Sequence, residues 1–372
     1  MPRVRISATR FSSLLVNRNL TPADVASRCK AQVRADLLAV EDQDIDFDDL
    51  VALAKLFKRP WSYLLIDEPE VLPDAGTDNR TFANREVKLS PDLLGELEAA
   101  DLMLEAAAEL FPDATFSVPR VASGEVPAAR LANDIRALLD VSVEEQLKIN
   151  DEYAALRRWV AAIHGQGVYV SQRKLKDPTI RAFSKVVENQ AIVVVDTGDT
   201  PYARIFSTLH EYCHVTLRST GVCDLDDHSQ TERYCNQVAA EVLLPAELLK
   251  ETITSGMFSG RDDVADAALK NLSKQLHVSQ AALLIRLRDY GTISQQVYEQ
   301  MELRRAARRS GGGALGKGQY YPVRINRASR LFAHRVVDAM TDGVIDRQDA
   351  SVLLDIGEHS VPRFVTELVK GD

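Results

Sequence analysis

The feature that most constrains this chain is the stretch from 205 to 214, which reads IFSTLHEYCH. No proline or glycine interrupts the chain from here to Gly221, so the pattern predicts a continuous helix. Residues four apart lie above one another on one face of a helix, which allows the imidazoles of His210 and His214 to reach one metal ion. Glu211 lies one position further round, close enough to act as general base on a water molecule beside that ion.

A third ligand is needed to distinguish a metal site from a surface helix with two unrelated histidines, because catalytic zinc normally takes three protein ligands. The segment 231–245, TERYCNQVAAEVLLP, predicts a second helix with Glu232 in its first turn. Asn236 follows on the same face one turn later, where it could orient a ligand. Glu241 is the alternative acid, but it lies among apolar residues two turns further on. We therefore favour Glu232 over Glu241.

Two sequence motifs, one following the other along the chain, extend this interpretation. His-Glu-x-x-His at 210–214 and Glu-x-x-Cys-Asn-x-x-Ala-Ala-x-x-Leu-x-Pro at 232–245 together resemble the ImmA/IrrE family of zinc metallopeptidases. The resemblance covers roughly residues 145–250. The chain departs from the family at Tyr212 and Cys213, where many members carry Leu-Gly. This bulkier pair should change the packing behind the site.

The resemblance implies a zinc ion on His210, His214 and Glu232, with Glu211 polarising the water that attacks a peptide bond. It also implies a narrow substrate, namely a repressor-type regulatory protein. The residue that stabilises the oxyanion is not determined by the sequence. His228, Tyr234 and Tyr212 are candidates because their side chains can donate hydrogen bonds.

Cysteine usage bears on the same site. Four cysteines in 372 residues do not indicate a disulfide framework. Cys213, Cys223 and Cys235 lie close to the predicted ligands in sequence, so a cysteine ligand is an alternative to buried, reduced thiols.

Length and charge limit the remaining possibilities. A chain of 372 residues is too long for one ordinary compact domain. Its net charge of −9 argues against a protein built wholly to coat nucleic acid. No apolar run approaches transmembrane length, and no hydrophobic stretch follows the basic N-terminus. We therefore expect a cytoplasmic protein with no membrane partner.

The periodicity predicts an α+β fold that is mostly helical. In the zincin-like domain we expect one helix over 143–164, strands near 168–170, 180–187 and 191–195, and a hairpin at Asn189. An exposed strand of this sheet could bind a peptide as an additional strand. A further helix is expected over 326–341. The predicted division is a helix-turn-helix-like bundle (1–68), a linker (69–90), a helical connector (91–140), a zincin-like metallopeptidase domain with a small antiparallel sheet (141–295), a basic glycine-rich linker (296–322) and a helical C-terminal tail (323–372).

The N-terminal segments 20–28, 50–57 and 61–65 (LTPADVASR, LVALAKLF and WSYLL) resemble the Xre-type helix-turn-helix module, mostly through their apolar spacing. A DNA-binding module needs cationic side chains for the phosphates. Arg28, Lys30 and Arg34 are the candidates.

The same region carries a feature unfavourable to DNA binding. The acidic run at 41–49 follows directly on the segment that would enter the groove. The alternative is therefore a scaffold or dimerisation module that keeps the fold without reading DNA, and a homodimer could form through it.

Two classes of function follow. The first is a zinc-dependent regulatory endopeptidase that cleaves a repressor-like partner. The second is a non-enzymatic regulator, because chains that join an Xre-like module to such a zinc domain also resemble antitoxins encoded beside ribonuclease toxins. Such a protein would bind a partner toxin, DNA or both, with a non-catalytic zinc domain.

Overall fold

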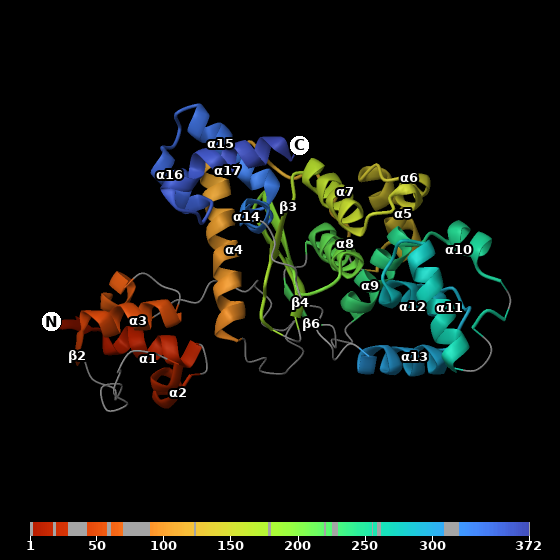
Figure 1. Ribbon diagram of the computed structural model, residues 1–372, viewed down its shortest axis with the longest axis horizontal. Helices are drawn as coiled ribbons and strands as arrows, with labels where there is room; N and C mark the ends of the chain where they lie inside the picture. Colours follow the sequence, from red (N-terminus) through yellow and green to blue (C-terminus); the bar gives the residue numbers. More distant parts are fainter. Residues whose placement is uncertain are drawn as a thin grey trace. The chain divides into compact units, whose positions relative to one another are not determined.

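The computed structural model describes residues 3–17, 20–28, 43–57, 61–69, 90–122, 124–177, 180–218, 221–224, 230–254, 256–258, 262–308 and 320–371. The chain forms two compact units, Met1–Asp101 and Leu102–Asp372, and their boundary falls within helix α4 (Pro91–Leu110). Helices predominate over two small sheets (Figure 1), in agreement with the predicted α+β class. No helix in the described ranges is long and apolar enough to cross a membrane.

The first unit contains a two-stranded sheet that the sequence did not predict. Strand β1 (Arg3–Ile6) pairs antiparallel with β2 (Gln43–Asp46). Ile6 and Ile45 are both buried, so each strand contributes an apolar side chain to the core of this unit. The other elements are α1 (Ala8–Asn17), α2 (Pro22–Arg28), α3 (Phe47–Phe57) and the 3-10 helix η2 (Trp61–Leu65).

Polar residues define where the helices of this unit begin. The backbone N–H of Thr21 donates to the Asp24 carboxylate at 2.8 Å, and the N–H of Asp24 donates to Thr21 Oγ1 at 3.2 Å. This reciprocal cap precedes α2. Asp48 and Asp49 lie in the first turn of α3, where negative charge is favourable next to the positive end of the helix dipole. Part of the acidic run therefore contributes to local folding.

The predicted DNA contacts fall mostly outside this description. Arg28 is the last residue of α2. Lys30, Arg34 and the segment expected to enter the groove lie outside the described residues. The helix-turn-helix assignment therefore stays a prediction.

The second unit contains a four-stranded sheet with helices packed against it. Its strands are β3 (Tyr169–Arg173), β4 (Ile180–Val187), β5 (Gln190–Asp196) and β6 (Gly221–Asp224). Its helices beyond α4 are α5 (Ala128–Leu138), α6 (Val143–Lys148), α7 (Glu152–Gly165), α8 (Pro201–Leu217), α9 (Gln230–Leu243), α10 (Ala246–Thr252), α11 (Asp262–Gln275), α12 (Gln280–Asp289), α13 (Gln295–Arg308), α14 (Tyr320–Ala328), α15 (Arg330–Thr341), α16 (Arg347–Leu353), the 3-10 helix η3 (Glu358–Ser360) and α17 (Val361–Lys370).

The order of strands in this sheet is β3-β5-β4-β6, and the sheet is mixed. The predicted β4–β5 hairpin is confirmed, with Glu188 at a positive φ of 51° in its turn. The prediction of an antiparallel sheet is wrong for one pair, because β3 runs parallel to β5. Strand β5 contains an uninterrupted apolar run at 191–195 and is buried on both faces. It therefore takes a central position in the sheet, with β4 on one side and β3 on the other.

The outer edge of β3 is covered where α14 meets α15. The predicted helix over 326–341 is broken at Ser329, which is buried with a φ of 66°. The backbone N–H of Val170 lies 3.2 Å from Ser329 Oγ and 3.3 Å from His164 Nε2. The Ser171 hydroxyl donates to the carbonyl of Arg327. The break thus supplies polar groups that occupy an otherwise unpaired strand edge.

Acidification is expected to weaken this contact. Burial lowers the pKa of His164 to about 3, and the positive charges of Arg330, His334 and Arg335 act in the same direction. Between pH 6.5 and 3 the unfolded chain therefore binds a proton that the folded chain excludes. His164 then contributes to stability fully above pH 6.5, and the unfolding free energy should fall by up to about 1.4 kcal/mol per pH unit below it.

Urea unfolding at pH 7, 6, 5 and 4 checks this expectation. A Trp61→Phe background leaves Trp159, in the second unit, as the single tryptophan reporter. His164→Gln should flatten the acid limb of the stability profile. Equal slopes with and without His164 would contradict the assignment.

Two other differences from the predicted helices have local causes. The helix expected over 143–164 is divided into α6 and α7, because the Asp151 side chain accepts a hydrogen bond from the N–H of Ala154 and begins a new helix. Residues 296–308, predicted to begin a linker, belong to α13. Arg304 anchors that helix to α11 through Asp262 at 3.1 Å and Asp266 at 3.2 Å.

Candidate metal centre

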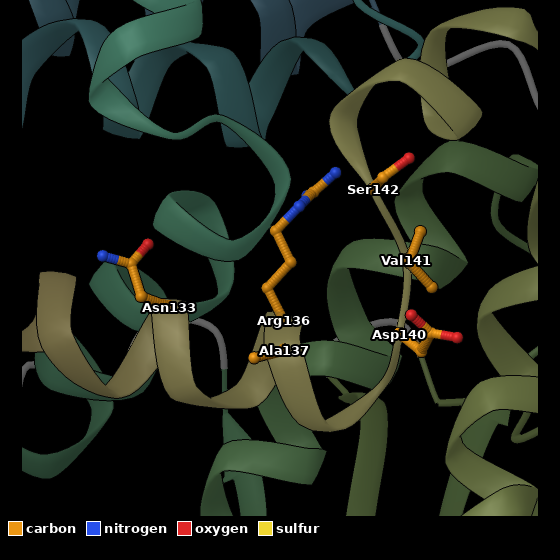
Figure 2. Close-up of a pocket in the computed structure, with 6 residues that line it drawn as sticks. All are labelled: Asn133, Arg136, Ala137, Asp140, Val141 and Ser142. Atoms are coloured by element: carbon orange, nitrogen blue, oxygen red, sulfur yellow. The ribbon is translucent and has the colours of Figure 1, made fainter.

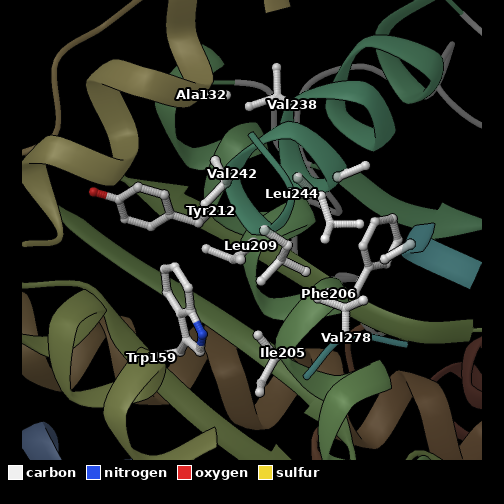
Figure 3. Packing of buried hydrophobic residues seen from close by; sticks show 14 of the residues in the cluster. Ala132, Trp159, Ile205, Phe206, Leu209, Tyr212, Val238, Val242, Leu244 and Val278 are labelled. Carbon is white, nitrogen blue, oxygen red and sulfur yellow. The ribbon is translucent and has the colours of Figure 1, made fainter. Parts of the chain in front are cut away.

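Helix α8 supplies the two histidines, and its amphipathic pattern determines where they point. The helix begins with Pro201, which suits the first turn because its missing N–H needs no partner there. Ile205, Leu209 and Tyr212 pack into the core of the second unit, as Figure 3 shows together with Trp159. His210 and His214 lie on a different side of the helix, where they meet α9.

The three predicted ligands converge. Nε2 of His210 lies 3.1 Å from Oε2 of Glu232, and Nε2 of His214 lies 3.1 Å from Oε1 of the same carboxylate. The two imidazole Nε2 atoms are 3.2 Å apart. All three side chains are buried. Glu232 reaches them from the first turn of α9, where the sequence placed it.

The charges of these groups are coupled. Burial would raise the pKa of Glu232, but hydrogen bonds and charge from the two imidazoles hold it well below its usual value. Burial would lower the pKa of His210, but the hydrogen bond and negative charge of Glu232 raise it overall. The carboxylate is thus ionised and oriented towards both nitrogens, as a metal ligand needs to be.

The donor set fits a zinc ion. Two neutral imidazoles and one carboxylate are ligands found in catalytic zinc sites. Ligand atoms at the usual zinc distances of about 2.0–2.2 Å are roughly 3.3 Å apart in a tetrahedron. The separations of 3.1, 3.1 and 3.2 Å are close to that value. Among the described residues, no cysteine joins this group, and Cys213 and Cys235 are both buried.

Glu211 lies beside the predicted ligands, and a residue of the sheet holds its carboxylate in position. Its Oε2 accepts a hydrogen bond of 2.7 Å from the hydroxyl of Ser184 on β4. Burial raises the pKa of Glu211, while the charges of His214 and His210 and the Ser184 hydrogen bond oppose that increase. Ser184 was not identified in the sequence. The signal was present, because Ser184 is a polar residue between Ala182 and Val186 on the strand face that packs towards α8.

Two further candidates from the sequence, Asn236 and Glu241, also lie on α9. Asn236 follows Glu232 by one turn on α9, but the buried Nδ1 of His210 has no hydrogen-bond partner among the described residues, so the role of Asn236 in orienting a ligand stays a prediction. Glu241, the rival acid, instead forms a buried ion pair of 2.5 Å with Arg286 of α12. Arg286 also donates to the carbonyl of Leu244 at 2.7 Å. Glu241 therefore joins α9 to α12 and takes no part in the metal group.

Two of the three oxyanion candidates are used elsewhere. Tyr212 is fully buried in the apolar cluster beside Leu209 and Val242 (Figure 3). Tyr234 donates its hydroxyl to the carbonyl of Val126 at 2.7 Å. Neither phenol forms a hydrogen bond with His210, His214 or Glu232, and His228 lies outside the described residues.

A separate surface pocket lies beside α5 (Figure 2). Its lining residues are Asn133, Arg136, Ala137, Asp140, Val141 and Ser142. Two nitrogens of Arg136 each donate to Gln146 Oε1 at 3.1 Å, and Nη1 also donates to the carbonyl of Val242. Its guanidinium therefore bridges α5, α6 and α9. None of the lining residues belongs to the metal group.

Comparison with known proteins agrees with the geometry for part of the chain. No curated protein matches the sequence. Residues 164–288, which include His210, His214, Glu232 and Glu211, match the family model Peptidase M78, described as the IrrE N-terminal-like domain. This segment is thus similar to a peptidase family of the metallopeptidase type.

Proposed function

We propose that this chain is a zinc-dependent endopeptidase with a regulatory substrate. The observation that carries the proposal is the convergence of His210, His214 and Glu232, with Glu211 buried next to them. A structural zinc site would need a fourth protein ligand. Three protein ligands and a separate carboxylate beside them, here that of Glu211, form the arrangement of a hydrolytic zinc site.

Three residues would bind the metal ion, and a fourth would transfer the proton. His210, His214 and Glu232 would hold the zinc ion, which supplies a Lewis acid for water activation and for the scissile carbonyl. Glu211 accepts the proton as water attacks the peptide carbon and delivers that proton to the departing amine. The packing of α8 against α7, α9 and the sheet would keep these side chains in place before the substrate arrives.

The sheet supports an extended peptide as the substrate. The outer edge of β3 is occupied by the Ser329 region, whereas β6 is the terminal strand on the opposite side. Gly221 of β6 pairs with Ser184, whose hydroxyl contacts Glu211. An extended segment of a repressor-like protein pairing alongside β6 would bring its backbone close to the general base.

Metal removal tests the proposed function. The full-length, zinc-loaded protein is incubated with a mixture of peptides of varied sequence and, separately, with repressor-like proteins encoded near its gene. Mass spectrometry identifies new termini. Cleavage should disappear after chelation and return when one equivalent of zinc is added. Undiminished cleavage by metal-free protein would contradict the proposal.

Full regulatory activity of a zinc-retaining Glu211→Gln variant in cells would favour the non-enzymatic regulator instead. In that case the zinc domain would act by binding a partner.

A further inference from the structure

Ser184 occupies a position that is costly for a polar side chain. It lies in the middle of β4, opposite Val193 of β5 on one side and Gly221 of β6 on the other. Only 1% of its surface is exposed. Its backbone is therefore fixed by two neighbouring strands. A buried hydroxyl needs a partner, and the partner here is the carboxylate of Glu211, 27 residues further along the chain.

The environment of Glu211 shows what this hydrogen bond opposes. Glu211 is also 1% exposed, and its neighbours His210 and His214 are both ligands. A carboxylate in a buried site is attracted to a cation nearby, and a carboxylate oxygen is itself a zinc ligand. If its side chain turned towards the ion, Glu211 would become a fourth ligand. The position that water needs would then be filled, and the general base would be lost.

We propose that Ser184 is a positioning residue that anchors one oxygen of Glu211 to the sheet and so keeps this side chain as general base rather than metal ligand. The inference rests on the proposed function, because it assigns a role within the same site. Ser184 contacts neither substrate nor ion and acts through Glu211. Strand β4 packs against α8, so the anchor connects the rigid sheet directly to the catalytic helix.

Three variants of the full-length protein test this role. Ser184→Ala removes the hydroxyl without adding volume, and Ser184→Thr restores it on a side chain suited to a strand. Ser171→Ala is the matched control, since Ser171 is an equally buried serine of the same sheet whose hydroxyl bonds to the carbonyl of Arg327. Zinc content and thermal midpoint are measured for each variant, followed by kcat and KM on the peptide that the wild type cleaves fastest.

Ser184→Ala should retain stoichiometric zinc and a KM within about twofold of wild type, with kcat reduced about 10- to 100-fold, the usual effect of losing an outer-shell partner. Ser184→Thr should recover most of kcat. A merely structural serine would affect stability in Ser184→Ala and Ser171→Ala alike, without this selective loss of kcat. A kcat of Ser184→Ala no lower than that of Ser171→Ala would overturn the proposal.

Crystal structures of zinc-loaded wild type and Ser184→Ala provide a readout that does not depend on catalysis. The Glu211 carboxylate should turn towards the ion in Ser184→Ala and stay on the sheet side in wild type. An unchanged Glu211 conformation would also overturn the proposal. If the wild type binds zinc but cleaves no peptide, the proposed function fails, and the two crystal structures still decide whether Ser184 positions Glu211.

Discussion

Glu211→Gln is expected to lower kcat by about 10²- to 10⁴-fold while leaving the zinc content of the protein unchanged. Glutamine keeps the size of the side chain and can still accept the 2.7 Å hydrogen bond from Ser184. It cannot accept a proton from the attacking water, so the step that generates the nucleophile loses its base. Steady-state cleavage of one identified peptide, together with metal analysis of the same preparation, measures both quantities.

The control for this variant is Gln190→Glu, which exchanges an amide for a carboxylate at a buried position of β5, outside the metal group. It should leave kcat per folded molecule close to that of the wild type. A Glu211→Gln protein that retains zinc and also retains more than about a tenth of wild-type kcat would assign the proton transfer to another residue.

Glu232→Ala is expected to weaken zinc binding by more than about 100-fold, since even the loss of an outer-shell partner costs 10- to 100-fold in affinity or activity. His210 and His214 would be left as two ligands without a third. The change removes no apolar packing from α9, whose buried valines and alanines and Leu243 stay in the core. Competition with a chromophoric chelator measures the affinity, and circular dichroism confirms that the helices persist.

Glu241→Ala is the matched control on the same helix and should give the opposite pattern. Zinc affinity of the folded protein should be unchanged, because Glu241 pairs with Arg286 at 2.5 Å and not with the histidines. Removing one partner of a buried ion pair leaves a charge uncompensated, so the unfolding free energy should fall by about 3–5 kcal/mol. Loss of zinc from folded Glu241→Ala with retention by Glu232→Ala would reverse the ligand assignment.

The sequence predicted the convergence of His210, His214 and Glu232 because each residue lies on a helix with a clear apolar periodicity. The four-residue spacing of His210 and His214 places them on one face of α8. Glu232 was preferred because Glu241 lies among apolar residues two turns further on, and in the structure Glu241 pairs with the buried Arg286 instead of joining the histidines. The uninterrupted apolar run of β5 and the turn at Asn189 similarly predicted the hairpin.

What the sequence did not predict depends on contacts between distant residues. The sequence marks Ser184 only as a polar residue on an apolar strand face, and its contact with Glu211 depends on how α8 packs across β4. The parallel pairing of β3 depends on which side of β5 is vacant. The break at Ser329 places a non-glycine residue at a positive φ, which is uncommon, and its partners His164 and Val170 lie about half the chain away.

The proposed function depends on one zinc ion that is bound jointly by residues of α8 and α9. The most direct measurement is a crystal structure of the zinc-loaded, full-length protein with anomalous data collected on both sides of the zinc absorption edge. We expect one strong anomalous peak within about 2.0–2.2 Å of His210 Nε2, His214 Nε2 and a Glu232 oxygen. A stoichiometric zinc ion located elsewhere, or these three side chains still paired with one another while zinc is bound to the protein, would contradict it.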